Sequence, residues 1–473
     1  MSEPRYRKEH DSMGEMSVPE WALWGATTQR AVENFPVSGR PIPPEVIHAF
    51  GHLKAACALV NLDLGKLPRE LAEAIIGAAE EVARGEHDAH FPIDVFQTGS
   101  GTSSNMNANE VIANRASQKA GKPIGSFQPV HPNDHVNMGQ SSNDTFPAAI
   151  HVAAAAVIKD ELVPALECLR ASLDRKANDW DAVIKIGRTH LMDATPIRVG
   201  QVFSGYASQA AHAIERAERA ISVLGELAIG GTAVGTGINT HVEFGARVAA
   251  ELSRRTGVRF REAANHFEAQ AAKDAYVEAS GELKTIAVSL SKIANDIRLL
   301  GSGPRCGIFE LMLPAVQPGS SIMPGKVNPV ICESVIQVAC QVAGNDATIA
   351  LANFGGVGSL MELNVAMPVM ADRMLDSIHL LALVSNVFVD KLLSGLEVNR
   401  ERCEALLEQS LMLVTSLAPE IGYEKAAKLA KEAFESGKTI RQLCMEKELL
   451  SAKRLDELLD PRSMTMPGGS GAA

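Results

Sequence analysis

The chain has 473 residues, of which 46 % are hydrophobic and 21 % are charged, which is the balance of a globular protein with a large buried core. Its formal net charge is −11 and it contains no long run of lysine and arginine, so a nucleic-acid partner is not expected. Aromatic residues make up only 4 %, and the many alanines and leucines favour helices over sheets, because these side chains lose little rotamer freedom in a helix.

The seven cysteines are scattered along the chain. They form no CxxC pair and no cluster with histidine at metal spacing, so we expect neither a bound metal nor an iron–sulfur cluster. Reduced thiols of this kind are typical of a cytoplasmic protein. Residues 1–16 lack the pattern of a signal or transit peptide, and no stretch approaches the roughly 20 apolar residues of a membrane span. We therefore predict a cytoplasmic protein without a membrane partner.

The first predicted domain covers residues 1–140 and is helical. Apolar spacing of three and four predicts amphipathic helices at 46–62 and 69–84. Two polar loops, at 99–107 and 131–142, carry hydroxyl and amide side chains ahead of further helical patterns.

The second predicted domain, residues 141–395, changes character. Long apolar stripes run through 158–173, 203–224, 283–297 and 331–349. Helices of this length pack best along one another in a bundle, and stripes this long can also be buried between subunits. We therefore predict a helix bundle in an oligomer.

The third predicted domain, residues 396–473, contains shorter helices. Asn399 is a suitable N-cap for a helix at 401–409. Further helices are predicted at 423–435, 439–447 and 451–459.

The polar stretches at 100–105 and 140–145 are the first candidates for a binding site. The former is not GxGxxG and follows no valine-rich strand, so a dinucleotide site is not indicated. A polar loop that leads into a helix N-terminus suits a carboxylate, although an ordinary capped turn would have the same residues. In the latter stretch one side chain is enough to cap the helix, so Ser141, Ser142 and Asn143 together exceed that need.

Two further stretches carry groups suited to catalysis. His190 has Thr189 beside it and Asp193 three positions on, which are possible orienting partners for a general base, although a lone histidine is more often structural. Residues 318–329 contain two serines, a lysine and an asparagine between prolines and glycines. Five residues separate the two glycines before Lys326, where a P-loop has four, and no GxSxG elbow surrounds Ser320. This stretch has the composition of a mobile lid.

Together these stretches resemble the fumarase/aspartase superfamily. The strings GSGTSSNMN, HPND, QSSND, GRTHLMDATP and GSSIMPGKVNP occur in family order, and IGYEKAAKLAKEA resembles the fumarase tail. The resemblance implies an all-α fold of three helical domains, whose central helices form a 20-helix core in a homotetramer. It also implies active sites shared by three subunits and a lyase that releases fumarate from a succinyl-type substrate.

Within the superfamily the details resemble class II fumarases. His190 stands where aspartases usually have glutamine, Gly325 where they usually have alanine, and the pair Ser141–Ser142 where they tend to have Ser–Thr. The implied reaction is the reversible hydration of fumarate to L-malate in the tricarboxylic acid cycle. Aspartate ammonia-lyase is the alternative enzyme, and a non-catalytic structural protein is a second alternative because the superfamily has been recruited in that way.

The resemblance also implies roles for individual residues. Ser320 would remove the C3 proton, and His190 would handle the water with Glu333 as its charge partner. An aci-carboxylate intermediate would need fixed donors, and adding water changes no redox state, so no cofactor is expected. The implied substrate-binding residues are Ser100, Gly101, Thr102, Ser141, Ser142, Asn143, Thr189, Ser321, Lys326, Val327 and Asn328.

A secondary anion site is implied at the turn His131, Pro132, Asn133 and Asp134. Many fumarases have a basic residue three positions before this histidine, where the chain has Gln128. This departure puts the affinity of the secondary site in doubt and leaves the main site unaffected.

Overall fold

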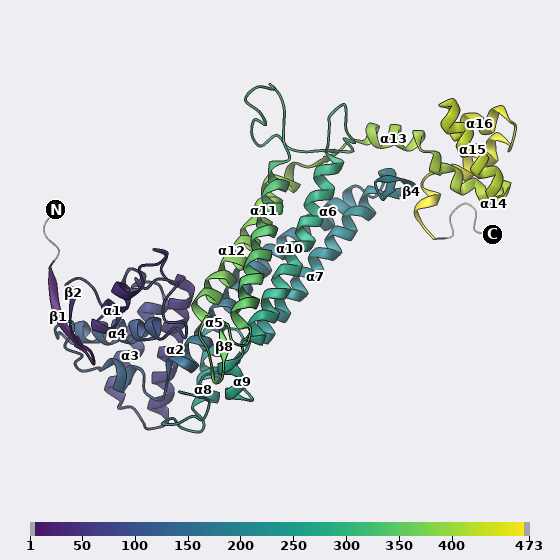
Figure 1. Cartoon of the computed structure of the whole chain (residues 1–473). Helices are drawn as coiled ribbons and strands as arrows, with labels where there is room; N and C mark the ends of the chain where they lie inside the picture. The colour runs from purple at the N-terminus through teal and green to yellow at the C-terminus, as the bar shows by residue number, and fades with distance from the viewer. Residues whose placement is uncertain (1–4, 468–473) are drawn as a thin grey trace. The chain divides into compact units, whose positions relative to one another are not determined.

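The computed structural model describes residues 5–467. The all-α prediction is confirmed, since the chain is 61 % helical with a few short strands (Figure 1). The outer ends of the first and last predicted domains, residues 1–4 and 468–473, lie outside the described residues. The backbone divides into two compact units. Unit 1 comprises Met1–Pro164, Ile214–Val288 and Val338–Leu383, and unit 2 comprises Ala165–Ala213, Ser289–Gln337 and Val384–Ala473. The bounds of the three predicted domains remain predictions.

Unit 1 begins with a hairpin and a group of helices (Figure 1). The predicted helices at 46–62 and 69–84 are confirmed as α2 and α3. A buried carboxylate, Glu110, fixes the start of α1 by accepting from the backbone N–H groups of Gly25, Thr27 and Thr28 at 2.9–3.1 Å. The elements are β1 (Tyr6–Asp11), β2 (Gly14–Pro19), α1 (Ala26–Asn34), α2 (Pro44–Asp63), α3 (Arg69–Ala83), η1 (Asp88–His90) and α4 (Thr102–Lys119).

The next elements of unit 1 form its core. α5 is alanine-rich and almost completely buried, and it packs with α2. A one-turn π-helix, η3, continues α5 before the next helix. The elements are η2 (Pro132–Val136), α5 (Ser142–Val157), η3 (Ile158–Leu162), β5 (Glu226–Leu227), α8 (Phe244–Thr256), β6 (Arg261–Glu262), α9 (His266–Ala271), β8 (Ser359–Leu360) and β9 (Leu363–Asn364).

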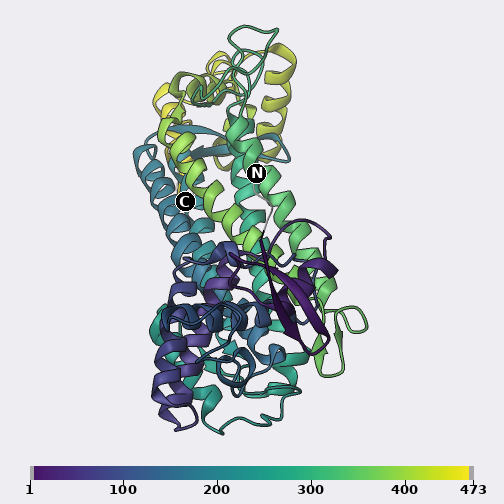
Figure 2. The same cartoon turned by 90° about the vertical axis from the view of Figure 1, so that its left-hand side faces the viewer.

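Four long helices follow the four predicted stripes, and a fifth long helix, α12, joins them (Figures 1 and 2). Within unit 1, Ser280 of α10 donates to Asp346 of α11 at 2.8 Å, and Asn345 of α11 donates to Asp376 of α12 at 2.8 Å. The bundle prediction is therefore confirmed, and α12 is an addition to it. The helices are α6 (Val163–Asp179), α7 (Val199–Leu224), α10 (Asp274–Leu300), α11 (Val330–Asn353) and α12 (Met367–Lys391).

Two segments, Val330–Asn353 and Met367–Gly395, are long and apolar enough to cross a membrane by length and composition alone. The expectation that no stretch reaches this limit is wrong for them, because few charges interrupt their alanine-, valine- and leucine-rich sequences. The core helices of soluble proteins meet the same criterion. Both helices also carry polar side chains, such as Asn345 and Asp376, that hydrogen-bond to one another.

Unit 2 contains a hairpin and a separate cluster of short helices. The predicted N-cap is confirmed, because Asn399 Oδ1 accepts from Arg402 N at 3.1 Å. The helices after it bury a small core of their own, which includes Leu417, Leu443 and Leu458. The elements are β3 (Ile184–Thr189), β4 (Met192–Arg198), β7 (Leu311–Met312), η4 (Leu393–Gly395), β10 (Glu397–Val398), α13 (Arg400–Gln409), η5 (Leu411–Leu417), α14 (Ala418–Ile421), α15 (Tyr423–Ser436), α16 (Ile440–Glu446), α17 (Ala452–Leu458) and η6 (Ser463–Thr465).

Candidate functional site

A chain of three hydroxyl groups connects the starts of α4 and α5 in unit 1. Ser100 Oγ and Thr102 Oγ1 share a hydrogen bond of 2.8 Å, and Thr102 Oγ1 shares another of 2.7 Å with Ser142 Oγ. These residues are 40 positions apart in sequence, so the fold brings together two of the predicted polar stretches.

Two glycines of the first stretch are required by packing. A Cβ atom on Gly99 would lie 1.6 Å from the carbonyl oxygen of Val365, and one on Gly101 would lie 2.0 Å from the ring of Phe146. Gly101 also has a φ of +74°, which favours glycine. Its place in the predicted substrate-binding set therefore has a structural explanation, namely that it lets the loop approach α5.

The second stretch divides its polar groups between capping and other contacts. Ser141 caps α5, with its Oγ accepting from Asn143 N at 3.2 Å. The side chain of Asn143 donates to the carbonyl of Ala233 at 2.8 Å, and Ser142 contacts Thr102. We call Thr102, Ser141, Ser142 and Asn143 the hydroxyl clamp.

A buried carboxylate holds the clamp against a distant loop. Asp144 Oδ1 accepts from Ser141 N at 2.9 Å, while its Oδ2 accepts from Gly230 N at 3.1 Å and Thr232 N at 2.9 Å. Burial raises the pKa of Asp144 to about 6 against the opposing effect of these three donors. The segment at 230–232 is thereby fixed beside the start of α5.

A buried ammonium group lies behind the clamp. Lys54 Nζ donates to Asn105 Oδ1 at 2.7 Å, Gln140 Oε1 at 2.9 Å and Asn137 Oδ1 at 3.1 Å. Its side chain is completely buried, and burial lowers its pKa to about 8. All three acceptors are neutral amides, so no carboxylate is hydrogen-bonded to this charge. Lys54 lies outside every predicted polar stretch, and Asp144 lies within the predicted stretch at 140–145 but was given no role there.

The clamp borders an open cavity of about 490 Å³. Of the described residues that line it, none carries a carboxylate. Neutral donors around a cavity with an ammonium group behind it suit an anion. The lining residues are Thr102, Asn105, Met106, Asn133, Asn137, Met138, Gly139, Gln140, Ser141, Ser142, Thr232, Ala233, Ile238 and Asn239.

The predicted secondary anion site forms a compact turn whose polar groups bond to one another. Asp134 N donates to His131 Nδ1 at 3.2 Å, and His131 N donates to His135 Nδ1 at 2.9 Å. Pro132 is buried in the π-turn, whereas Asn133 is exposed and lines the same cavity as the clamp. The turn therefore borders the candidate site.

His190 lies at the tip of the β3–β4 hairpin in unit 2. Thr189 pairs with Met192 in the hairpin, so His190 and Leu191 form a two-residue turn. Both have positive φ, +55° and +64°, a conformation that histidine adopts more readily than most residues and that is uncommon for leucine. Asp193, expected as an orienting partner, pairs with Arg188 in the hairpin register and forms no bond to His190 within the described chain.

The base of this hairpin is anchored by buried charges. Glu310, only 1 % exposed, pairs with Lys185 at 3.0 Å and with Arg188 at 2.9 Å. Burial lowers the pKa of Lys185 against the opposing effect of Glu310. The exposed tip with His190 therefore extends from a firmly held base.

Residues 318–329, which we call the serine loop, close on themselves in unit 2. Gly319 N donates to the carbonyl of Lys326 at 2.8 Å, and Asn328 Nδ2 donates to the carbonyl of Gly319 at 2.7 Å. Ser320 Oγ accepts from Ile322 N at 3.3 Å and from Met323 N at 3.1 Å. Two N–H groups aimed at one hydroxyl oxygen would stabilise negative charge on it.

Most of the other predicted site residues of the serine loop are more exposed than Ser320. Ser321, Lys326 and Val327 are exposed, and Asn328 is half-buried. Glu333 lies in the first turn of α11 and forms no ion pair with His190 in the part of the chain that the structure describes.

The predicted site residues thus form two sets. The clamp, Ser100 and the His131–Asp134 turn belong to unit 1. His190, Thr189, the serine loop and Glu333 belong to unit 2. Each unit by itself therefore carries half of the predicted chemistry.

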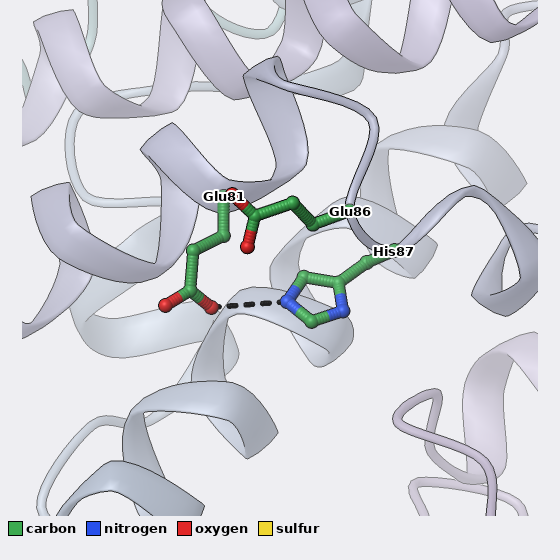
Figure 3. A group of neighbouring side chains, drawn as sticks. All are labelled: Glu81, Glu86 and His87. Atoms are coloured by element: carbon green, nitrogen blue, oxygen red, sulfur yellow. Dashed lines mark hydrogen bonds and ion pairs between the residues drawn. The ribbon is translucent and has the colours of Figure 1, made fainter.

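One group among residues 5–467 has the arrangement of a possible metal site, namely Glu81, Glu86 and His87 (Figure 3). Glu81 already accepts from His87 at 3.0 Å, from Arg115 at 2.5 Å and from Lys119 at 2.9 Å. Burial opposes ionisation of Glu81, but the hydrogen bonds from these three side chains outweigh it and hold the pKa of Glu81 well below the usual range. A metal ion would have to displace them, so this geometry is that of an ion-pair cluster.

Comparisons with known proteins agree over nearly the whole chain. Residues 14–344 match the family described as Lyase, and residues 413–466 match the family described as Fumarase C C-terminus. Proteins named fumarate hydratase class II from Corynebacterium glutamicum and Mycobacterium tuberculosis are 58 % and 57 % identical over 464 residues each. These alignments cover 98 % and 97 % of this chain and 96 % of each relative.

Two solved structures are also similar. The recombinant class II fumarase of Schistosoma mansoni has a TM-score of 0.93 at 40 % identity. A fumarate lyase:delta crystallin from Brucella melitensis, bound to cobalt, has a TM-score of 0.94 at 44 % identity. Each match covers 98 % of this chain and 100 % of the other.

Proposed function

Because the chain belongs to the lyase family of the class II fumarate hydratases, we propose that it adds water reversibly to fumarate to give L-malate. The observation that carries this proposal is the cavity beside the hydroxyl clamp. Its lining residues are neutral donors and apolar groups, and the ammonium group of Lys54 lies behind three of its amides. A small dicarboxylate has the charge and the acceptor groups that such a cavity binds.

The reaction calls for donors fixed around a carboxylate. Removing a proton from C3 of malate leaves a carbanion whose charge spreads onto the neighbouring carboxylate, and each fixed donor aimed at such charge is typically worth about 10²–10³ in rate. Ser141, Ser142 and Thr102 have the right chemistry, and Asp144 holds the helix start that carries the two serines. Lys326 and Asn328 would complete the set from the serine loop.

Ser320 would act as the base in this reaction. A serine hydroxyl is a poor base unless its alkoxide is stabilised. The N–H groups of Ile322 and Met323, which donate to Ser320 Oγ, support this role because they favour negative charge on that oxygen. The proton on C3 would pass to the Ser320 alkoxide, and the C2 hydroxyl would leave as water.

His190 would protonate that leaving hydroxyl, with Glu333 as its charge partner. Its position in a turn with two positive φ angles supports a functional role, because strained backbone clusters at functional sites. Thr189 precedes His190 on the same hairpin, and its hydroxyl would form a hydrogen bond to the substrate.

We also propose a homotetramer whose active sites are shared by three subunits. Large apolar side chains on the long helices support this assembly, because in one chain Val288 is 63 % exposed, Leu351 54 % and Leu383 61 %. The division of the site residues between two units of the chain is a second reason to expect shared sites. Sedimentation with cross-linking would test the oligomeric state.

The setting of the proposed activity is the tricarboxylic acid cycle in the cytoplasm. Adding water to the double bond changes no oxidation state, so the reaction itself requires no redox cofactor. Fractionation of cells followed by an activity assay would test the location.

The decisive assay follows the ultraviolet absorbance of fumarate with malate and then with aspartate as the substrate. We expect fumarate to form from malate alone. Fumarate formation with ammonia release from aspartate would identify an aspartate ammonia-lyase. Inactivity on both substrates, in a folded oligomer, would favour a non-catalytic role.

A further inference from the structure

Thr232 lies in the loop between β5 and α8, outside every stretch that the sequence resemblance marks as functional. It lines the same cavity as Thr102, Ser141 and Ser142. The residue is only 3 % exposed, yet its Oγ1 has no hydrogen-bond partner among residues 5–467. Buried hydroxyl groups are almost always hydrogen-bonded, so an unpaired one beside a cavity points to a partner that occupies the cavity.

The backbone of Thr232 is held in an unfavourable conformation. Its φ is +54°, which is a genuine outlier for a β-branched residue. Two buried contacts fix it there: Thr232 N donates to Asp144 Oδ2 at 2.9 Å, and Gln270 Nε2 donates to the Thr232 carbonyl at 2.9 Å. Backbone strain of this kind persists only where the surroundings enforce it, and it clusters at ligand sites.

The same contacts fix Thr232 relative to the hydroxyl clamp. The second oxygen of Asp144 accepts from Ser141 N, so one carboxylate holds both segments. The side chain of Asn143 donates to the carbonyl of Ala233, the next residue in the loop. Because the clamp and Thr232 are joined through Asp144 by a buried and a half-buried bond, and by the exposed Asn143–Ala233 bond, their hydroxyl groups keep a constant arrangement around the cavity.

The chemistry of the cavity indicates what the hydroxyl binds. The described lining carries no carboxylate, and the Lys54 ammonium lies behind Asn105, Asn137 and Gln140. An anion is therefore favoured over a cation, and a threonine hydroxyl can donate one hydrogen bond to it.

We propose that the Thr232 hydroxyl is a further substrate-binding group, which donates a hydrogen bond to a carboxylate oxygen of the bound C4 dicarboxylate. This inference rests on the proposed hydration of fumarate. It adds a third segment of unit 1, the loop between β5 and α8, to the residues that determine the affinity for the dicarboxylate.

Two complementary variants test the role of the hydroxyl. Thr232→Val keeps the shape and the branched Cβ but removes the hydroxyl, whereas Thr232→Ser keeps the hydroxyl. A hydrogen bond to a charged group predicts a loss of about ten-fold to a hundred-fold for the valine variant. We expect this loss in kcat/KM for fumarate and in calorimetric affinity for succinate, a non-reacting dicarboxylate. The serine variant should stay within about three-fold of the wild type.

Other outcomes would overturn the proposal. Wild-type affinity for succinate in Thr232→Val would show that the hydroxyl does not bind a carboxylate. Equal losses in the valine and serine variants would show that keeping the hydroxyl does not preserve binding, and would assign the effect to packing at this position. If the valine variant does not fold, the pair Thr232→Ser and Thr232→Ala replaces it, because both lack the branched Cβ and differ only in the hydroxyl.

Failure of the proposed function itself would look different. In that case the wild-type chain would not interconvert malate and fumarate at all, whatever residue stands at position 232. The succinate titration of the wild type and of the two variants would still report whether the hydroxyl binds a dicarboxylate.

Discussion

The hydroxyl clamp and the serine loop are held in opposite ways. The clamp is fixed from behind by two fully buried charged groups, Asp144 and Lys54, which together make six hydrogen bonds. The serine loop is closed mainly by bonds within itself, and Ile322 at its centre is 84 % exposed. In the proposed enzyme, one half of the chemistry therefore lies on firmly packed segments and the other half on an exposed loop.

This difference matches the two tasks of such a reaction. Donors that stabilise developing charge are most effective when they need no rearrangement. A group that removes a proton from an enclosed substrate must first admit that substrate, which requires a segment that opens. Variants in the clamp should therefore change binding and the response to pH, whereas variants in the serine loop should change turnover.

The largest effect is expected for Ser320→Ala. Removing the proposed base should lower kcat by about 10³-fold or more, with the oligomer intact, because no neighbouring hydroxyl has the same two N–H donors. Gln317→Ala, an exposed change just before the loop, is the control and should leave kcat unchanged. His190→Asn should also abolish most turnover. A near-normal rate for Ser320→Ala would refute the role of Ser320 as the base. A near-normal rate for His190→Asn would refute the role of His190 in protonating the leaving hydroxyl.

The helices of this protein are predictable from its sequence, because apolar spacing is a local property. The same spacing recurs in α12 at Met370, Met374, Ile378 and Leu381, so that helix was within reach of the same rule. The first turns of α10 were not predicted, since the helix begins at Asp274, nine positions before the predicted start at 283.

The buried contacts behind the clamp could not be predicted from apolar spacing. Lys54 has the sequence context of a solvated lysine on an amphipathic helix, and its amide partners lie 51 to 86 positions away. Thr232 reaches Asp144 across 88 positions. Contacts of this range depend on how α2, α5 and the loop after β5 pack, which no local pattern contains. The same holds for the turn at His190, because Leu191 is not a residue that favours positive φ.

Lys54→Met tests the contribution of the buried charge behind the hydroxyl clamp. Losing the charge behind the clamp should lower kcat/KM for fumarate about ten-fold to a hundred-fold, mainly through KM. Lys122→Met, on an exposed turn, is the control and should have no effect. Because burial lowers the pKa of Lys54 to about 8, wild-type kcat/KM should fall as pH rises through about 8. This decline should be absent in Lys54→Met, and its persistence there would assign it to another group.

His379→Gln tests whether charged groups also stabilise unit 1 outside the clamp. His379 of α12 bonds to Glu45 of α2 and to Glu161 of η3 at 3.0 Å each, and the Glu45 bond is the main reason why its pKa rises to about 9. A raised pKa stabilises the fold below the unfolded value of about 6.5, and the contribution disappears as pH rises through about 9.

After allowance for solvent screening, this ion-pair cluster is worth about 1–2 kcal/mol. The variant should therefore unfold more easily than the wild type at pH 6, and equally easily above about pH 9.5. Denaturant titrations at both pH values provide the measurement. His10→Gln removes an exposed histidine of the β1–β2 hairpin and should change neither value. A deficit that persists at high pH would show that packing, rather than charge, is what His379 contributes.

The smallest effect is expected at the His190 turn, the exposed tip of a hairpin whose strand β3 is anchored by the ion pairs of Glu310. Leu191 is 74 % exposed and has a φ of +64°, so glycine at this position should relieve strain while little burial is lost. We expect Leu191→Gly to raise the free energy of unfolding by about 0.5–1 kcal/mol. Met192→Gly is the matched control, because Met192 is 69 % exposed but lies in a strand with ordinary φ, and it should lower that free energy by a similar amount.

The activity of Leu191→Gly then decides what the strain is for. If the turn holds the His190 imidazole in one orientation, the more stable protein should be the slower enzyme, because a glycine beside His190 loosens its backbone. A gain in stability with unchanged kcat would mean that the hairpin tip is strained without consequence for the chemistry. In that case the clamp and its two buried charges would be the part of the site whose geometry is fixed before the substrate binds.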